Sequence, residues 1–184
     1  SRVCSTCYGA LTNQVSQGVK LRLDDQARQK NRHMVWKSRV NLIKHARQMM
    51  AQKAYPDAAV SYEKYIRVVE MAYELKPGQL NPGVFGNTAR SKEITIIATT
   101  YWDLLRIYDT MPQYRNRMQA TAQKLAEFLP YSPIFPDVIK RAQALTGTAK
   151  SPDLVKDFLR RSKVGGGRCF IATAAFANEY HPVV

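Results

Sequence analysis

The fold class depends on one stretch, SKEITIIATTYWDLLRIYD, which occupies residues 91–109. Its run of β-branched residues at 94–97 is typical of a strand. Apolar side chains nevertheless recur at helical spacing over the whole stretch, at Ile94, Ile97, Ala98, Tyr101, Leu105 and Tyr108. Ser91 is also a favourable residue for capping a helix at its start. We therefore expect a helix from Ser91 to about Asp109.

The chain on either side of this stretch also shows helical patterns. Residues 21–54 contain no proline or glycine, and apolar residues recur at helical spacing, so we expect one long helix there. Asp24 and Asp25 are placed to favour its start. Prolines at first-turn positions predict four more helices, over 56–75, from 112 to the stop at Pro130, over 136–145 and over 152–161. The sequence thus predicts an all-α fold of stacked antiparallel helical hairpins.

Less regular segments divide the 184 residues into three parts. Residues 1–18 are expected to form a short knuckle or an extended arm, and residues 19–163 the helical domain. Residues 164–184 are expected to be a flexible glycine joint followed by a tail. Inside the domain, residues 76–91 are rich in glycine, proline and asparagine, which predicts a long loop. Loops of that length are often functional or disordered.

One predicted hairpin is similar to a known repeat family. The segment AYPDAAVSYEKYI, residues 54–66, resembles the centre of a tetratricopeptide repeat. The aromatic, small and proline positions of the repeat are matched by Tyr55, Ala58, Tyr62 and Pro77. Lys53 stands where the family has glycine, and Tyr65 stands where it has alanine. The resemblance covers one hairpin and implies a binding scaffold, although any antiparallel hairpin needs small residues where its helices cross.

The chain is strongly basic, with 28 Lys and Arg residues against 14 acids and a net charge of +14. Residues 26–53 contain eight basic residues and no acid. Lys30, Lys37 and Lys44 lie within about 40° of one another on a helix and point away from the apolar Leu42 and Ala46. A solvated helix face usually mixes charges of both signs, because opposite charges four residues apart stabilise a helix.

We therefore predict a polyanion-binding surface on this helix, as the alternative to an ordinary solvated face. Contacts with phosphate are the expected use, so the partner is expected to be RNA or a ribonucleoprotein. An acidic protein partner stays open. The predicted binding residues are Arg28, Lys30, Arg32, Lys37, Arg39, Lys44 and Arg47.

The tail contains a second resemblance. Residues 169–176, CFIATAAF, resemble the CFI box, a short C-terminal module of many otherwise unrelated bacterial proteins. His181 and Pro182 also match a pair found shortly after that box, whereas Ala177 replaces its expected glycine. The resemblance implies a bacterial source and no particular activity. Cys169 is then expected to be either a small buried packing residue or part of a functional site.

Cysteines at both ends of the chain raise the question of a metal. Cys4 and Cys7 have the spacing of a zinc knuckle, and Cys169 with His181 would complete a tetrahedral set of four ligands. Zinc is therefore a candidate cofactor that would join the two ends of the chain. The alternative is a redox-active or incidental pair of cysteines near the N-terminus.

No pattern in the chain specifies a catalytic centre. A nucleophilic Cys169 would need a base, and the arrangement of His33, His45 and His181 does not specify a triad. We therefore expect no enzyme, and predict a non-catalytic adaptor that binds RNA or a ribonucleoprotein and belongs to a larger assembly. The alternatives are a structural scaffold that joins proteins and, third, a cysteine enzyme that uses Cys169. Three cysteines, an odd number, and no apolar run long enough to span a membrane indicate the cytoplasm.

Overall fold

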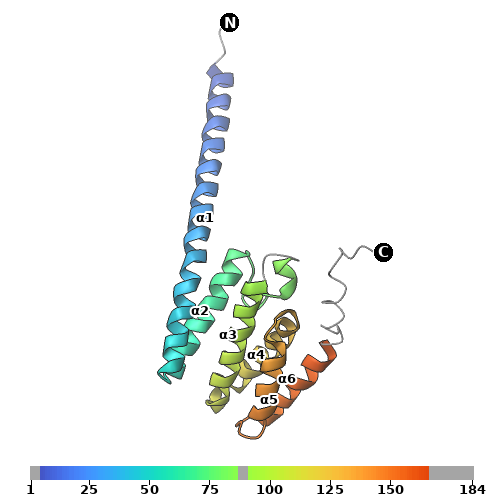
Figure 1. The fold of residues 1–184 in the computed structure, drawn as a ribbon. Helices are drawn as coiled ribbons and strands as arrows, with labels where there is room; N and C mark the ends of the chain where they lie inside the picture. Colours follow the sequence, from blue (N-terminus) through green and yellow to red (C-terminus); the bar gives the residue numbers. More distant parts are fainter. Residues whose placement is uncertain (1–4, 87–90, 166–184) are drawn as a thin grey trace, which may run out of the picture.

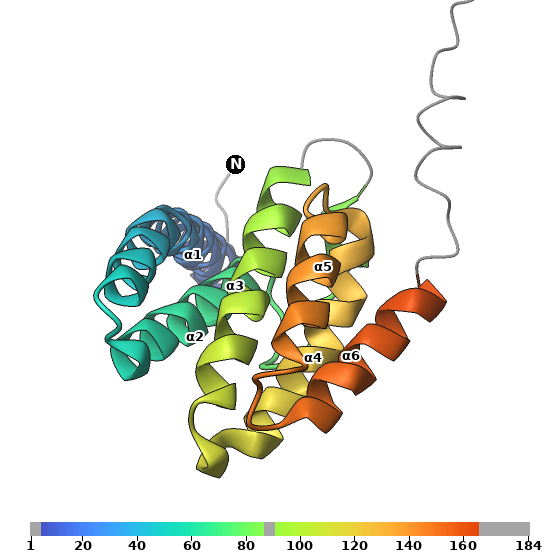
Figure 2. The same cartoon turned by 60° about the horizontal axis from the view of Figure 1, so that its bottom comes forward.

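The computed structural model describes residues 5–86 and 91–165, which are almost entirely helical (Figure 1). The described residues contain no strand. Three short 3₁₀ turns, at Pro82–Phe85, Pro112–Tyr114 and Leu129–Tyr131, lie between the helices. The α-helices are α1 Ser5–Ala51, α2 Tyr55–Ala72, α3 Ser91–Asp109, α4 Arg115–Phe128, α5 Phe135–Leu145 and α6 Pro152–Gly165. Consecutive helices pair as hairpins, and the hairpins pack side by side (Figure 2), which confirms the predicted all-α stack.

Helix α1 begins earlier than the sequence predicts. It starts at Ser5 and continues through Gly18 without a break, so the predicted knuckle or arm over residues 1–18 is wrong for the part that the structure describes. Asp24 and Asp25 lie inside the helix and not at its start. No proline interrupts residues 5–51, and a glycine within a helix costs only about 1 kcal/mol relative to alanine, which explains why the helix persists.

The first half of α1 projects away from the other helices (Figure 1). Every residue from Val15 to Met34 is exposed, whereas Ile43 and Ala46 are buried against the body. Only the second half of the helix therefore packs as part of the α1–α2 hairpin. Ala58 of α2, the small residue expected at the crossing of this hairpin, is also fully buried.

Helix α3 lies at the centre of the core. All six apolar positions predicted for its inner face are buried, which confirms the choice of helix over strand at residues 94–97. Four aromatic contacts run from α1 through α2 and the turn at 82–85 to α4 and α3, with ring centroids 5.0–6.2 Å apart. The rings in this series belong to Trp36, Tyr73, Phe85, Phe128 and Tyr101.

The predicted loop over residues 76–91 is partly a core element. Leu80 and Phe85 are fully buried, and the turn Pro82–Phe85 holds the second of them in place. The Gly78 amide donates a hydrogen bond of 2.6 Å to Glu70, and Lys124 donates one of 2.9 Å to the Leu80 carbonyl. This segment is thus fixed to the body at several points, which a count of its glycines and prolines does not reveal.

Helices α2 and α3 are joined by tyrosine hydroxyls that donate to carboxylates. The Tyr62 hydroxyl lies 2.7 Å from Asp103, the Tyr65 hydroxyl lies 2.6 Å from Glu93, and Tyr108 donates to Glu63. Burial is the first cause that raises the pKa of all three tyrosines far above the ordinary value of 10.0, and the neighbouring carboxylates add to it. The rings therefore stay neutral donors in the folded protein. No helix among the described residues is both long and apolar enough to cross a membrane.

Candidate polyanion-binding face

The outer side of α1 carries three lysines in a row, at Lys30, Lys37 and Lys44. All three are exposed, and none forms an ion pair with another described residue. Since 3.6 residues make one turn, they lie almost opposite to the buried Ala46 and well to the side of the buried Ile43. The predicted stripe therefore faces solvent along both the projecting half of the helix and the packed half. We call these three residues the lysine face.

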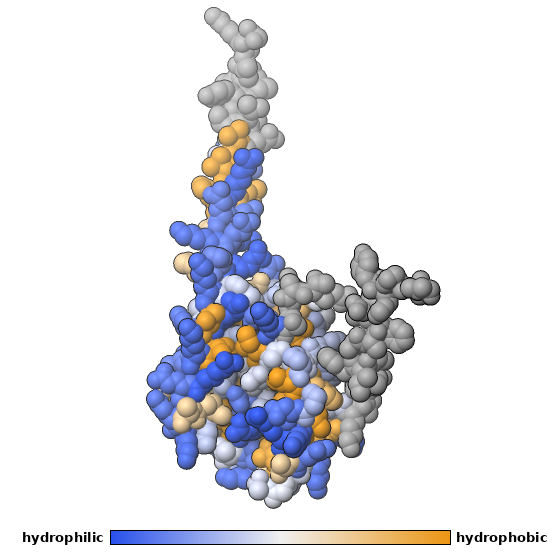
Figure 3. Space-filling model, viewed as in Figure 1, coloured by the Kyte–Doolittle hydropathy of each residue, from blue (hydrophilic) through white to orange (hydrophobic). Residues whose placement is uncertain are grey.

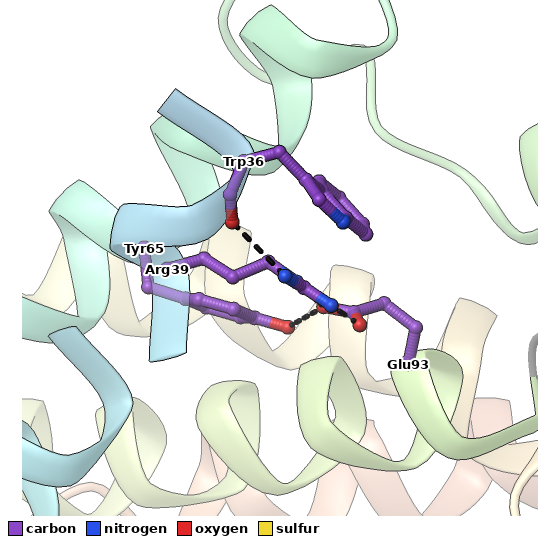
Figure 4. Close-up of polar contacts among 4 residues, drawn as sticks. All are labelled: Trp36, Arg39, Tyr65 and Glu93. Carbon is purple, nitrogen blue, oxygen red and sulfur yellow. Dashed lines mark hydrogen bonds and ion pairs between the residues drawn. The ribbon is translucent and has the colours of Figure 1, made fainter. Parts of the chain in front are cut away.

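Two arginines of the predicted set turn toward the body. Arg32 forms an ion pair of 2.9 Å with Glu74, and both side chains are largely exposed. Arg39 lies 3.3 Å from Glu93 in a pair that is mostly buried, with side-chain exposures of 21% and 11%. Its guanidinium also stacks on the ring of Trp36 at 3.6 Å and donates to the Trp36 carbonyl (Figure 4). Arg39 is therefore committed to the fold.

The four residues drawn in Figure 4 connect three helices. Trp36 and Arg39 come from α1, Tyr65 from α2 and Glu93 from α3, and the Glu93 carboxylate accepts from both Arg39 and Tyr65. Burial, and next the charge of Glu93, raise the pKa of Tyr65. This arrangement fixes the rotation of α1 about its axis, and it thereby directs the lysine face outward.

A groove with a volume of about 740 Å³ opens beside this network, between α1 and the ends of α2 and α3. Its charged lining is mainly basic, with Arg32, Arg39 and Lys92 against Glu93 alone. His33, Trp36 and Tyr73 also line it. The sequence did not indicate Lys92 as a partner of the basic helix, because it lies 60 residues beyond Arg32 and reaches the groove only through the packing of α3.

The remaining two predicted binding residues, Arg28 and Arg47, lie on different halves of α1. Arg28 is exposed on the projecting half of the helix, where Lys20 and Arg22 extend the basic surface toward the N-terminus. Arg47 is exposed near the packed end, and its charge acts on the pair formed by Tyr62 and Asp103. The structure thus leaves Arg28, Arg47 and the lysine face as cations without an ion pair to a described residue.

Apolar side chains are also exposed on the projecting half of α1. Val15, Val19, Leu21 and Leu23 are between 52% and 65% exposed. In Figure 3 this apolar region lies beyond the hydrophilic section of the same helix. Contiguous exposed apolar patches mark surfaces that contact a partner, and Val15, Val19 and Leu23 follow one another at four-residue spacing on one side of the helix.

The cysteine-based predictions lie mostly outside the described residues. This applies to Cys4, Cys169 and His181, and also to the CFI-box tail, so the zinc site stays a prediction. Cys7 falls within α1. Among the residues that the structure describes, no group of histidine, cysteine and acidic side chains is arranged to hold a metal.

The two histidines of α1 have different surroundings. His45 Nδ1 lies 2.9 Å from Ser61 Oγ, and the Ser61 hydroxyl itself donates to the Asp57 carbonyl. With the Ser61 proton on the Asp57 carbonyl, the matching tautomer of His45 carries its proton on Nδ1 and donates it to Ser61. His33 lines the groove beside Trp36.

The chain matches no family model, no curated protein and no solved structure. The tetratricopeptide and CFI-box resemblances therefore stay resemblances.

Proposed function

We propose that this protein is a non-catalytic adaptor that binds RNA, free or within a ribonucleoprotein, through the outer side of α1. The observation that carries the proposal is the lysine face, which is exposed along its length and has no ion pair with a described residue. Glu74 and Glu93, the acids that form ion pairs with described residues of α1, are both paired with arginines on its inner side. The outer side is left with uncompensated positive charge.

The geometry of the lysine face suits a phosphate backbone. Residues seven apart on a helix are separated by roughly 10 Å along its axis, which is about two turns. The three ammonium groups therefore form a line with this spacing. Ammonium groups bind phosphates as point charges and do not read base sequence. We therefore expect binding that depends on charge density, with Arg47, about 60° from Lys44 around the helix axis, contributing at one end of the line.

The test is the affinity for a fluorescein-labelled single-stranded RNA of mixed sequence, measured by fluorescence anisotropy. The variant Lys30→Glu, Lys37→Glu, Lys44→Glu places three negative charges on the lysine face and is expected to abolish binding. Because all three side chains are exposed, the circular dichroism spectrum and the urea midpoint are expected to stay close to those of the parent.

A matched control separates a local surface from net charge. Lys64, Lys140 and Lys156 are also exposed but lie on α2, α5 and α6. Changing these three to glutamate gives the same total charge, and we expect it to reduce affinity far less. Equal losses in the two triple variants would show that only net charge matters, and unchanged binding in the first variant would refute the proposal.

A second function is favoured by the exposed apolar residues of the projecting half of α1. A structural scaffold subunit would bury Val15, Val19, Leu21 and Leu23 against another protein. In that case binding would be insensitive to salt and would have a fixed protein stoichiometry. Changing Val19 and Leu23 to serine would then weaken the complex, whereas the lysine-face variant would leave it intact.

Both proposals place the protein in the cytoplasm as part of a larger assembly. The two functions differ in the surface used, so a tagged chain incubated with native lysate, with and without nuclease, separates them. Loss of the retained proteins after nuclease supports RNA binding. Retention of one defined set of proteins after nuclease supports the scaffold.

A further inference from the structure

The groove between α1 and the ends of α2 and α3, which we call the α1 groove, is continuous with the lysine face. His33 lies three residues after Lys30 and four residues before Lys37, so its side chain neighbours both lysines on the helix surface. The same side chain is exposed and lines the groove. A ligand that lies along the lysine face can therefore reach the α1 groove past His33.

The α1 groove has the size and the lining of a small-ligand site. Its volume of about 740 Å³ lies within the range of about 300–1,000 Å³ that is typical of ligand pockets. The lining contains three ring side chains, His33, Trp36 and Tyr73, and Gln29 adds an exposed amide. Ring side chains with a few polar groups suit a planar heterocycle.

Trp36 presents part of its indole to this groove. Arg39 stacks on the ring at 3.6 Å, and the ring of Tyr73 meets it at an angle of 82°. These contacts fix the indole without enclosing it, because Trp36 is only half-buried. Its indole N–H has no hydrogen-bond partner among the described residues and is not one of the buried unpaired atoms, so it is in contact with solvent. The indole is thus a fixed and accessible wall of the groove.

A cation is also available to a ligand in the α1 groove. Lys92, near the start of α3, is exposed, lines the groove and forms no ion pair with another described residue. Arg32 is paired with Glu74, but both side chains are largely exposed, so this pair is weak. Glu93, the acid in the lining, is already compensated by Arg39. The groove therefore favours a ligand that carries negative charge beside a ring.

We propose that the α1 groove receives an unpaired nucleobase of the RNA that the lysine face holds. This inference rests on the proposed RNA binding and specifies its substrate class as single-stranded RNA. The base lies against Trp36 and His33, and Lys92 binds an adjacent phosphate. Stacking of this kind tolerates any sequence, because every base has a π-face. A duplex cannot use the groove, since its bases are paired and stacked inside the double helix.

The test follows the Trp36 indole N–H by NMR of the ¹⁵N-labelled chain. The chain has two tryptophans, and the Trp36→Phe variant identifies which indole signal belongs to Trp36. The ligands are a single-stranded RNA of mixed sequence, its duplex with the complementary strand, and a strand of equal length built from tetrahydrofuran abasic units, which carries the phosphates without the bases. We expect the Trp36 signal to move and saturate with the single strand and to move much less with the other two. The Trp102 signal, from a residue that is only 5% exposed, is the internal reference.

A variant of His33 tests the groove through affinity, measured by fluorescence anisotropy. His33→Ala removes one ring that the base contacts, so the ratio of affinities for the single strand and the abasic strand is expected to fall by about fivefold. His45→Ala is the matched control, since His45 is also an exposed histidine of α1 but does not line the groove.

The outcomes separate the groove from the lysine face. A Trp36 signal that responds equally to the single strand and the abasic strand, or an affinity ratio that His33→Ala does not change, would overturn the groove and leave RNA binding by the lysine face intact. Binding of none of the three ligands would overturn both proposals.

Discussion

Arg32 and Arg39 occupy equivalent positions two turns apart on α1, yet their environments differ. The Arg32–Glu74 pair is in solvent, with side-chain exposures of 48% and 78%. The Arg39–Glu93 pair is mostly shielded from water, and Trp36 and Tyr65 add a cation–π contact and a hydrogen bond to it. At the scale of single residues, burial therefore decides which charges hold the fold and which are free to bind.

The first prediction compares these two pairs. Glu93→Gln removes the charge that compensates Arg39 and weakens the acceptor for Tyr65, so the free energy of unfolding is expected to fall by about 2 kcal/mol. Glu74→Gln is the control and is expected to cost about 0.5 kcal/mol or less, since exposed ion pairs contribute little. Urea unfolding followed by circular dichroism measures both, and equal effects would contradict the account.

The second prediction concerns Asp103. Burial raises the pKa of this carboxyl above 3.8, although its bond from Tyr62 and the nearby arginines oppose the rise. The folded state therefore holds the proton more tightly than the unfolded state does. As a result, Asp103 costs stability as the pH rises above 3.8 through its folded pKa.

Asp103→Asn removes this cost while keeping an oxygen that can accept from Tyr62. Its stability relative to the parent is expected to increase as the pH is raised from 3.5 to 7 (about the range in which a buried carboxyl titrates). Urea unfolding at a series of pH values gives this difference. A variant that becomes progressively less stable than the parent over the same range would refute the assignment.

The free cations could be predicted only in part from the sequence. The helical repeat of seven correctly places Lys30, Lys37 and Lys44 on one exposed side. The commitment of Arg39 could not be predicted, because Glu93 is 54 residues away in the chain and meets it only once α3 has packed.

At the scale of elements, α1 consists of two halves with different stability. The half after Val35 packs on α2, whereas every residue from Val15 to Met34 is exposed, including Arg32 with its ion pair to Glu74. Most of the stability of a helix in a protein comes from tertiary packing, which the exposed half lacks. We therefore expect amide hydrogens of residues 13–34 to exchange with solvent much faster than those of residues 42–51.

The third prediction uses Gly18, which lies within the projecting half. A Cβ atom there would meet nothing within 4 Å, so Gly18→Ala should stabilise the local helix by about 0.5–1 kcal/mol. Hydrogen exchange followed by mass spectrometry is expected to slow around residue 18 without a change in the body. Gly86→Ala is the contrast. The φ of +59° at this position favours glycine, so the free energy of unfolding of the helical body should fall by about 1 kcal/mol. Unchanged exchange around residue 18 would contradict the prediction.

Helices were the most predictable elements, because prolines mark their starts and apolar spacing marks their inner faces. Residues 5–20 were the exception, since their glycines and polar residues concealed a helix that contains no proline. The segment 76–86 was the second exception. Its turn residues correctly indicate a change of direction, but the burial of Leu80 and Phe85 depends on contacts with distant helices.

At the scale of the whole molecule, buried tyrosines make the fold sensitive to alkali. Burial raises the pKa of Tyr62, Tyr65, Tyr101 and Tyr108 above the ordinary value of 10.0. The folded state therefore keeps protons that the unfolded state releases, and stability falls as the pH rises above 10.0. We expect cooperative unfolding in this range, together with the release of tyrosine protons.

The fourth prediction isolates one of these groups. Tyr101→Phe removes a titrating hydroxyl from the core, so the free energy of unfolding should fall less steeply above pH 10. The slopes of the parent and the variant are expected to differ by up to about 1.4 kcal/mol per pH unit. Urea unfolding at successive alkaline pH values gives the slope. Tyr131→Phe changes an exposed ring and is expected to leave the slope unaltered. An equal slope in the parent and in Tyr101→Phe would contradict the account.

The salt dependence of RNA binding tests whether the lysine face contacts phosphates. The affinity of the parent and of the neutral variant Lys30→Gln, Lys37→Gln, Lys44→Gln is measured for the same single-stranded RNA over a range of salt concentrations. Each lysine that contacts a phosphate adds about 0.7 to the slope of log affinity against log salt, so the variant should lose about 2 units of slope. Identical slopes for the two proteins would mean that these lysines do not meet the RNA.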